Sequence, residues 1–440
     1  MLTHFSRILG ICIGAVVIVF GTYGTSNGGA YFTGTVYAMY ALPFLLLLIS
    51  SLLFFDLLRH NRLSIYPFVS LEGQILLVIL LLTTASTLRL PQYLLTSIFT
   101  VALSIVVIAF LVNRMRSEAE FKALFSFYQS LIYFTAILAL CSGAYSILVG
   151  PIVAGPLLVE YNPLFWRMNA WFNASTMLGL FFSHAVFSAY YFLLRARTYI
   201  GVGLHVLAII GFVVGLALAG GRTGAATCLL SFAALALVRT KPTPFRLLCV
   251  CVFAGGLIGS ASYLVYQYGE SVYLVRRFFD VSDTFGGRSE FLADALQVME
   301  KSTVDQVIFG FGVNGVRDIL KWDNSPHSGM IRIWLEHGLL TIAMYFLLNA
   351  IALRRLCTGL RRRDSLDAER QAIFLTLLTF FVAEAMVIQL FGVDLFYALF
   401  LTVFSFYVAL RKIKRRRSSE LRSRPTTALS TSVASGSLVS

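Results

Sequence analysis

Residues 199–224 read YIGVGLHVLAIIGFVVGLALAGGRTG, and this stretch decides how the chain folds. No Asp, Glu, Lys or Arg occurs over residues 199–219, a run as long as the roughly 20 apolar residues that a helix needs to cross a bilayer. The run is continuous rather than alternating, which excludes a membrane-spanning β-strand. Because backbone amides find no water in the hydrocarbon core, we predict a transmembrane α-helix over residues 199–219.

Similar apolar runs recur along the whole chain of 440 residues. Hydrophobic residues make up 58% of it and charged residues only 13%, against about a quarter in soluble proteins. This composition excludes a soluble globular protein and predicts an all-α polytopic membrane protein of about 12 transmembrane helices. The predicted spans are residues 8–23, 35–58, 67–88, 93–112, 123–149, 173–193, 199–219, 224–239, 246–266, 332–353, 372–392 and 395–410.

The basic residues predict the orientation of these spans. Of the 35 Lys and Arg residues, 25 fall in the two termini and in the loops on one side of the membrane. Cytoplasmic loops carry such an excess, so both termini are predicted to be cytoplasmic. The net charge of +14 is therefore a topology signal, and no nucleic-acid partner is expected.

The spans divide the chain into four parts. Residues 1–266 hold transmembrane helices 1–9, and residues 267–331 form one large loop on the outer face. Residues 332–410 hold helices 10–12, and residues 411–440 are a basic tail predicted to be disordered. Inside the large loop, apolar residues at helical spacing predict two amphipathic helices that lie on the membrane surface or cap the bundle. These residues are Phe291, Leu292, Ala295, Leu296 and Met299 for the first, and Val313, Val316, Ile319 and Leu320 for the second.

Glycine and arginine lie together at two outer-face positions. Arg222 follows two glycines after the span 199–219, and Arg288 follows two glycines in the large loop. Glycine exposes backbone amides and the guanidinium supplies a planar fork, a combination that suits a phosphate or pyrophosphate group. The alternative is that each arginine only anchors a helix end at the headgroup level.

The large loop closes with DNSPHSG, residues 323–329. His327 is either a solvated loop histidine or a titratable group for catalysis near neutral pH. The six histidines are scattered over both faces and within spans, so no metal site is predicted. Gly310, Gly312 and Gly315 match the spacing of a dinucleotide fingerprint without its βαβ unit, and we interpret them as a glycine-rich turn before a surface helix.

Ionisable residues inside predicted spans are functional hypotheses by default. They are Glu72, Glu384, His184 and His205. Many transporters contain internal repeats, and we find none in this sequence. Interhelical hydrogen bonding is therefore the favoured role for these residues. Glu336 has a potential partner one turn back, in Arg332.

At these outer-face residues the sequence resembles the O-antigen ligase and O-antigen polymerase superfamily. Arg288 is followed after three residues by Leu292, a pattern that the ligases share. His327 and Ser328 are followed after nine residues by Gly338, close to the ligase histidine motif.

Two further positions bear on the resemblance. Arg222, between the seventh and eighth spans, is similar in position to another arginine of the family. Thr341 stands in place of the second glycine of the histidine motif. This departure counts against the ligase assignment more than against membership of the superfamily.

The resemblance implies a C-type glycosyltransferase fold in the bacterial inner membrane. A ligase would transfer a glycan from undecaprenyl pyrophosphate to a sugar hydroxyl of lipid A–core at the periplasmic face, with no metal or other cofactor. A polymerase of the same superfamily would extend a growing O-antigen or exopolysaccharide glycan. A carrier or flippase for lipid-linked sugars is the alternative from another class, and membrane lipids surround the protein in every case.

Breaking the anomeric bond leaves negative charge on the pyrophosphate, which fixed cations and amide donors can stabilise. We assign Arg222 and Arg288 to that role. His327 is the candidate general base, or an imidazolium that donates to the pyrophosphate. Candidates for substrate binding are Arg276, Arg277, Asp323 and Arg167. Asp323 and Asp305 are rival bases, and Trp166, Trp171 and Trp322 either stack on sugars or belong to an interfacial aromatic belt.

Overall fold

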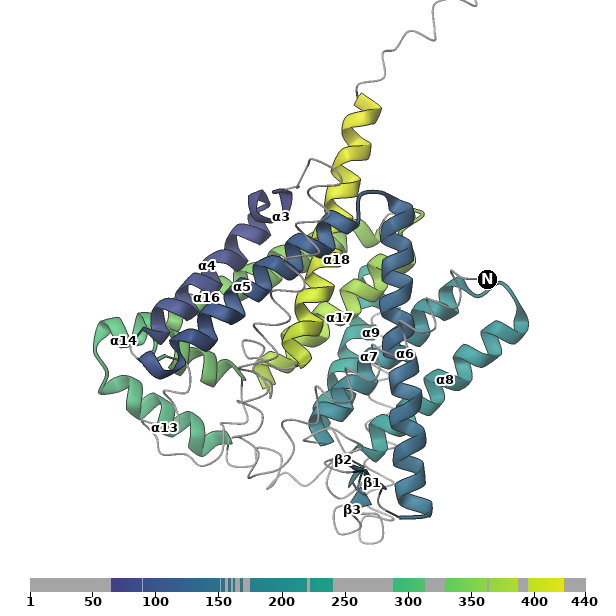
Figure 1. The fold of residues 1–440 in the computed structure, drawn as a ribbon, viewed down its shortest axis with the longest axis horizontal. Helices are drawn as coiled ribbons and strands as arrows, with labels where there is room; N and C mark the ends of the chain where they lie inside the picture. Colours follow the sequence, from purple (N-terminus) through teal and green to yellow (C-terminus); the bar gives the residue numbers. More distant parts are fainter. Residues whose placement is uncertain are drawn as a thin grey trace, which may run out of the picture.

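The computed structural model describes residues 65–88, 90–150, 175–219, 222–239, 288–312, 329–361, 364–386 and 395–422, with short strand segments between residues 152 and 168. Within these residues the fold is almost entirely helical (Figure 1). Four helical stretches are long and apolar enough to cross a membrane: Glu118–Leu148, Leu178–Arg195, Tyr199–Leu218 and Gly329–Leu360. The chain therefore has the character of a helical membrane protein.

Nine of the twelve predicted spans coincide with helices of the structure. The predicted span 67–88 corresponds to two helices, α3 (Tyr66–Val69) and α4 (Leu71–Thr87). The other eight spans correspond to one helix each: α5 (Pro91–Arg114), α6 (Glu118–Leu148), α7 (Ser175–Arg195), α8 (Tyr199–Leu218), α9 (Arg222–Arg239), α16 (Gly329–Leu360), α17 (Asp367–Met386) and α18 (Leu395–Arg422). The predicted spans 8–23, 35–58 and 246–266 lie outside the described residues, so a total of twelve stays a prediction.

Helix ends follow local sequence signals. Ser117 and Glu120 form a capping box at the start of α6, which satisfies amides that the helix itself leaves free. An arginine lies in the last turn of each of three helices: Arg114 in α5, Arg195 in α7 and Arg239 in α9. Cations are favourable at helix C-termini, and these three belong to the side that the charge distribution assigns to the cytoplasm.

Helices α17 and α18 lie between two groups of helices, α4, α5 and α16 on one side and α6, α7, α8 and α9 on the other (Figure 1). Helix α17 packs on α7, α9 and α16, and α18 packs on α5, α6 and α17. Aromatic rings fill the junction, where Phe406 of α18 lies edge-on to Phe121 and Phe125 of α6, with centroids 5.9 and 4.9 Å apart. The hydrophobic core therefore consists of side chains at the contacts between these helices.

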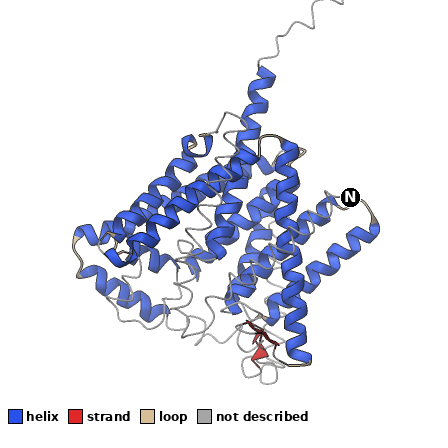
Figure 2. Ribbon diagram, in the orientation of Figure 1, coloured by secondary structure: helices blue, strands red, loops and turns tan. Residues whose placement is uncertain are grey.

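The strands of the structure lie in the segment after α6 (Figure 2). Strand β1 (Ile152–Ala154) pairs antiparallel with β2 (Leu157–Val159), and β3 (Tyr161–Asn162) pairs with β4 (Arg167–Met168). With two or three residues each, these strands are far too short to cross a bilayer. The all-α class is borne out by the described helices, and these hairpins were not predicted because strands of this length give no clear periodicity in sequence.

The segment predicted as a large outer loop, residues 267–331, contains two described helices, α13 (Arg288–Glu300) and α14 (Val304–Phe309). Helix α13 confirms the first predicted amphipathic helix, although Leu296, assigned to its apolar face, is 51% exposed. Ala295 and Met299 carry the buried face instead. Helix α14 was not predicted, because six residues are too few for a periodic pattern to be distinguished. The second predicted helix, at residues 313–320, lies outside the described residues.

The start of the tail corrects one prediction. Helix α18 continues to Arg422, so residues 411–422 are helical rather than disordered. Their charges are partly neutralised by distant residues, since Lys414 lies 3.3 Å from Asp364, between α16 and α17, and Arg417 pairs with Glu118 of α6. Composition alone does not reveal such partners, which are distant in sequence.

Three of the four ionisable side chains inside predicted spans have their surroundings described, and all three contact other helices. Glu72 of α4 accepts hydrogen bonds from Arg355 of α16 and from Tyr407 and Arg411 of α18. His184 packs on Phe380 with ring centroids 4.7 Å apart, and His205 stacks on Phe192. The interhelical role is confirmed for Glu72, whereas the side chain of Glu384 lies outside the description.

Candidate active site

The first turn of α9, which begins at Arg222, is fixed against α7. A side chain on Gly224 would place its Cβ 2.6 Å from the carbonyl of Gly179, so only glycine permits this approach of the two backbones. The hydroxyl of Ser183 lies 2.8 Å from the Gly224 carbonyl and 3.1 Å from that of Gly179. The last glycine of GGRTG therefore packs helices together, and it fixes the backbone that carries Arg222.

We expect Ser183→Ala to lower the free energy of unfolding by about 1 kcal/mol, since a buried carbonyl loses a hydrogen bond between helices. Ser130→Ala is the matched control, because its hydroxyl bonds 2.8 Å to Ser126 within α6. Unfolding of the detergent-solubilised proteins measures both. An equal loss in the two variants would contradict a special role for the α7–α9 contact.

Arg288 begins α13, which docks on the first turns of α16. Ala295 and Met299 of α13 are buried against Leu335 of α16. Residues packed around them are Val298, Val307, Phe311, Ile331 and Trp334. Helix α16 starts at Gly329, two residues after His327. The helix that carries Arg288 is therefore packed on the helix that follows His327.

Helix α16 is broken at Gly338, where the backbone has φ 80° and ψ 174°. Gly310, which ends α14, has φ 76° and ψ −176° and lies against this break. Both conformations belong to a region that is essentially restricted to glycine. A Cβ on Gly338 would lie 2.1 Å from the Ile308 oxygen, and one on Gly310 would lie 2.4 Å from the Glu336 carbonyl. Neither glycine tolerates a side chain.

The turn after α14 is hydrogen-bonded into the break of α16. The amide of Phe311 donates to the carbonyl of Leu335 over 2.8 Å, and the amide of Gly312 donates to that of Glu336 over 2.7 Å. In an uninterrupted helix these carbonyls would accept from amides four residues later. The glycine-rich turn is therefore confirmed at Gly310 and Gly312, and it joins α14 to α16, whereas Gly315 and the surface helix expected after it lie outside the described residues.

Four polar side chains surround the break: Ser86, Arg332, Glu336 and His337. The predicted pair of Arg332 with Glu336 is confirmed, at 2.9 Å. His337 is fully buried, with Nδ1 3.0 Å from the hydroxyl of Ser86. That hydroxyl also lies 2.9 Å from the carbonyl of Thr83, to which it donates. The other nitrogen, Nε2, lies 4.0 Å from Oε2 of Glu336 and has no hydrogen-bond partner among the described atoms.

Sequence patterns did not indicate this buried cluster around His337. The available signal was Gly338, the glycine of the histidine motif. Thr341, which replaces the motif's second glycine, is buried, and its hydroxyl donates to the His337 carbonyl over 2.7 Å. The substitution is thus accommodated by a hydrogen bond within α16.

The predicted site residues are placed only in part. Arg222 and Arg288 are the first residues of α9 and α13, and Arg167 lies in β4 opposite Asn162, but their side chains lie outside the description. Asp305, a rival base, is exposed in the first turn of α14. His327, Arg276, Arg277 and Asp323 lie outside the described residues. Their convergence on one site therefore stays a prediction.

No group of three or more His, Cys, Asp or Glu side chains that could hold a metal ion occurs within the part of the chain that the structure describes.

Residues 206–346 match the family model described as O-antigen ligase. The match starts in α8 and ends in α16, so it includes Arg222, Arg288, His327 and the break at Gly338. The resemblance to the O-antigen ligase superfamily is confirmed by this match. A comparison of the chain with curated proteins finds no match.

Proposed function

We propose that this protein is a bacterial inner-membrane glycosyltransferase that moves a glycan from undecaprenyl pyrophosphate to a sugar hydroxyl of lipid A–core at the periplasmic face. The observation that carries the proposal is the family match at residues 206–346, which contains both glycine–arginine motifs and the histidine motif. The described helices, several of them long and apolar, provide the membrane setting that a lipid-linked donor requires.

The reaction needs one bond to form and one to break. The acceptor hydroxyl oxygen attacks the anomeric carbon, and the bond from that carbon to the pyrophosphate oxygen breaks. The electron pair leaves with the lipid pyrophosphate, and the hydroxyl proton goes to His327 as general base. Arg222 and Arg288 stabilise the charge that grows on the leaving group.

The helix positions of the two arginines support this assignment. Each is the first residue of a helix, α9 or α13, where the backbone amides of the first turn have no partner within the helix. Amides and the helix dipole favour an anion at such an end. A guanidinium placed there adds a bidentate donor for a phosphate oxygen pair.

We expect His327→Gln to lower the transfer rate about 100-fold, because the acceptor proton loses its base. For a histidine base near its usual pKa of about 6.5, the wild-type rate rises as the pH rises through that value. The glutamine variant loses this rise. A pH–rate profile measured with a lipid-linked donor, with Asp323→Asn as the comparison, checks the assignment. Unchanged turnover in the histidine variant would exclude it as the base.

A repeat-unit polymerase is the second candidate, and the threonine at position 341 favours it because the ligase motif has glycine there. The lipopolysaccharide of a deletion strain distinguishes the two on a gel. Loss of all capped species, with lipid-linked polymer accumulating, indicates a ligase, whereas capping by a single repeat indicates a polymerase. Accumulation of unflipped repeat units would instead indicate a carrier or flippase.

A further inference from the structure

A basic pocket lies at the C-terminal end of α16, the end away from Gly338. Its volume is about 550 Å³, within the roughly 300–1,000 Å³ range of small-molecule sites. The end of α16, the middle of α18 and the starts of α3 and α17 surround it, at the side that the basic residues assign to the cytoplasm. Its lining includes the basic residues Arg355, Arg370, Arg411, Lys414 and Arg415.

The lining of this basic pocket contains five cations and no carboxylate. Among the described residues, carboxylates that contact those cations from outside the lining include Glu72, Asp364 and Asp367, and Asp367 also pairs with Arg239 at 2.9 Å. Cations gathered on the walls of a cavity attract an anion more strongly than cations spread over a surface.

Glu72 holds two of the lining cations in place. Its side chain is 1% exposed, and a single oxygen, Oε1, accepts from both Arg355 and Arg411. One carboxylate neutralises one of these two guanidinium groups. Both arginine side chains remain about one-third exposed, at 35% and 32%, and both line the pocket. They are thus positioned by Glu72 and still available to a ligand.

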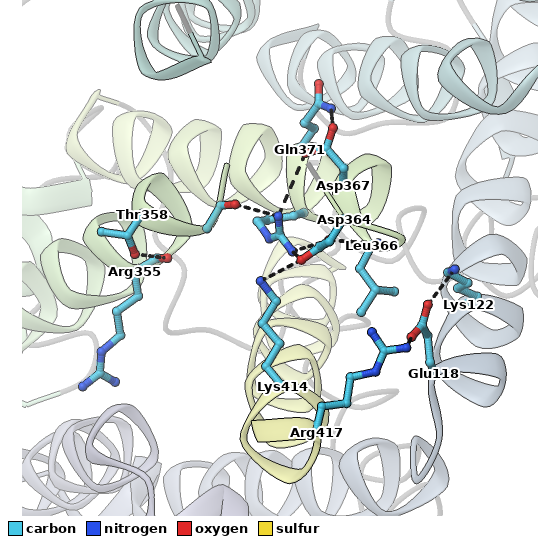
Figure 3. A network of polar contacts seen from close by, with 12 residues as sticks. Glu118, Lys122, Arg355, Thr358, Asp364, Leu366, Asp367, Gln371, Lys414 and Arg417 are labelled. Atoms are coloured by element: carbon cyan, nitrogen blue, oxygen red, sulfur yellow. Dashed lines mark hydrogen bonds and ion pairs between the residues drawn. The ribbon is translucent and has the colours of Figure 1, made fainter. Parts of the chain in front are cut away.

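The opposite wall is held by Asp364 (Figure 3). This carboxylate binds the guanidinium of buried Arg370 at 2.6 and 2.7 Å and lies 3.3 Å from Nζ of Lys414. Burial would raise the pKa of Asp364, but the hydrogen bonds from Arg370 and the charge of Lys414 hold it below its usual value. Gly359 leaves room for Arg370, whose stem would lie 2.8 Å from a Cβ at that position.

The remaining lining is largely apolar. Tyr66, Leu356, Tyr407 and Leu410 contribute carbon surface beside the cations. Cations at the headgroup level beside apolar walls between helices are the features that recognise the headgroup of an anionic lipid. Soluble phosphate compounds present the same charged group without the acyl chains.

We propose that the basic pocket binds the phosphate group of an anionic ligand, either the headgroup of a phospholipid or a soluble phosphate. This site is separate from the proposed transfer chemistry at Arg222, Arg288 and His327.

Native mass spectrometry of the full chain in an uncharged detergent tests the proposal. The lipid probes are short-chain phosphatidylglycerol and phosphatidylcholine, and the soluble probe is inorganic phosphate in a calorimetric titration. The pocket variant is Lys414→Gln/Arg415→Gln, whose side chains are at least one-third exposed and whose loss should leave the fold intact. The control is Arg416→Gln/Arg417→Gln, which removes the same charge from the same helix outside the lining.

We expect the wild-type and control proteins to bind phosphatidylglycerol in preference to phosphatidylcholine, and the pocket variant to bind it roughly thirtyfold more weakly. Binding of inorganic phosphate with the same dependence on Lys414 and Arg415 also supports the site and identifies a soluble ligand. Equal phosphatidylglycerol binding by the pocket variant and the control overturns the proposal. Failure of the wild-type protein to bind either anionic probe overturns it as well.

Discussion

Replacing Arg222 or Arg288 with glutamine is expected to lower the glycan transfer rate by about 10²–10³-fold, the loss seen when one donor to a developing negative charge is removed. The reason is that charge appears on the pyrophosphate only as the anomeric bond breaks. Lysine keeps the charge but lacks the planar fork, so the lysine variants should also be slow. The measurement is transfer in a reconstituted system with a defined lipid-linked donor and lipid A–core acceptor.

Arg197→Lys is the control for this prediction, because Arg197 is exposed in the loop between α7 and α8, at the other end of α8 from Arg222. Its rate should equal that of the wild type. Full activity in both the Arg222→Lys and Arg288→Lys proteins would remove the two arginines from the mechanism. Equal losses in all three lysine variants would point to a general effect on the fold.

Gly338→Ala is expected to lower the free energy of unfolding by about 4 kcal/mol, from two sources. Alanine in this backbone conformation costs about 1–3 kcal/mol, and forcing atoms into a packed region costs about 1–3 kcal/mol more. The clash is severe, because the new Cβ would lie 2.1 Å from the Ile308 oxygen and 2.6 Å from the Gly310 amide nitrogen. Denaturant unfolding in detergent measures the change.

Gly203→Ala in α8 provides the matched control, since no atom lies within 4 Å of a Cβ at that position. Alanine favours a helix over glycine by about 1 kcal/mol, so this variant should be as stable as the wild type or slightly more so. A Gly338→Ala protein that unfolds like the control would show that α14 is not held in the break of α16.

The spans were predictable because a bilayer imposes a length and a composition on each helix separately. The contact between Gly310 and Gly338 was not, since two glycines meet through backbone atoms that no side-chain pattern records. The partners of Glu72 were equally hidden, because Arg355 is 283 residues away and Arg411 is 339 residues away. Sequence patterns predict where each helix lies in the chain, whereas these contacts depend on which helices pack together.

The same distinction applies to the site. Glycine beside arginine indicated two anion-binding positions, and both proved to be helix starts, at Arg222 and Arg288. The role of Gly224 in packing α9 against α7 was not indicated, since it depends on Gly179 and Ser183 in another helix. The neighbours that fix the backbone at Arg222 could not be predicted, and a common site for Arg222, Arg288 and His327 stays a prediction.

The buried carboxylate of Glu72 has a consequence for how the protein is made. Arg411 and Tyr407, two of its three partners, belong to α18 and leave the ribosome more than 330 residues after it. A nascent chain that has not yet delivered α18 holds this acid with Arg355 alone, and a buried charge with too few partners is costly. The surroundings of Glu72 are therefore completed only once α18 has been made.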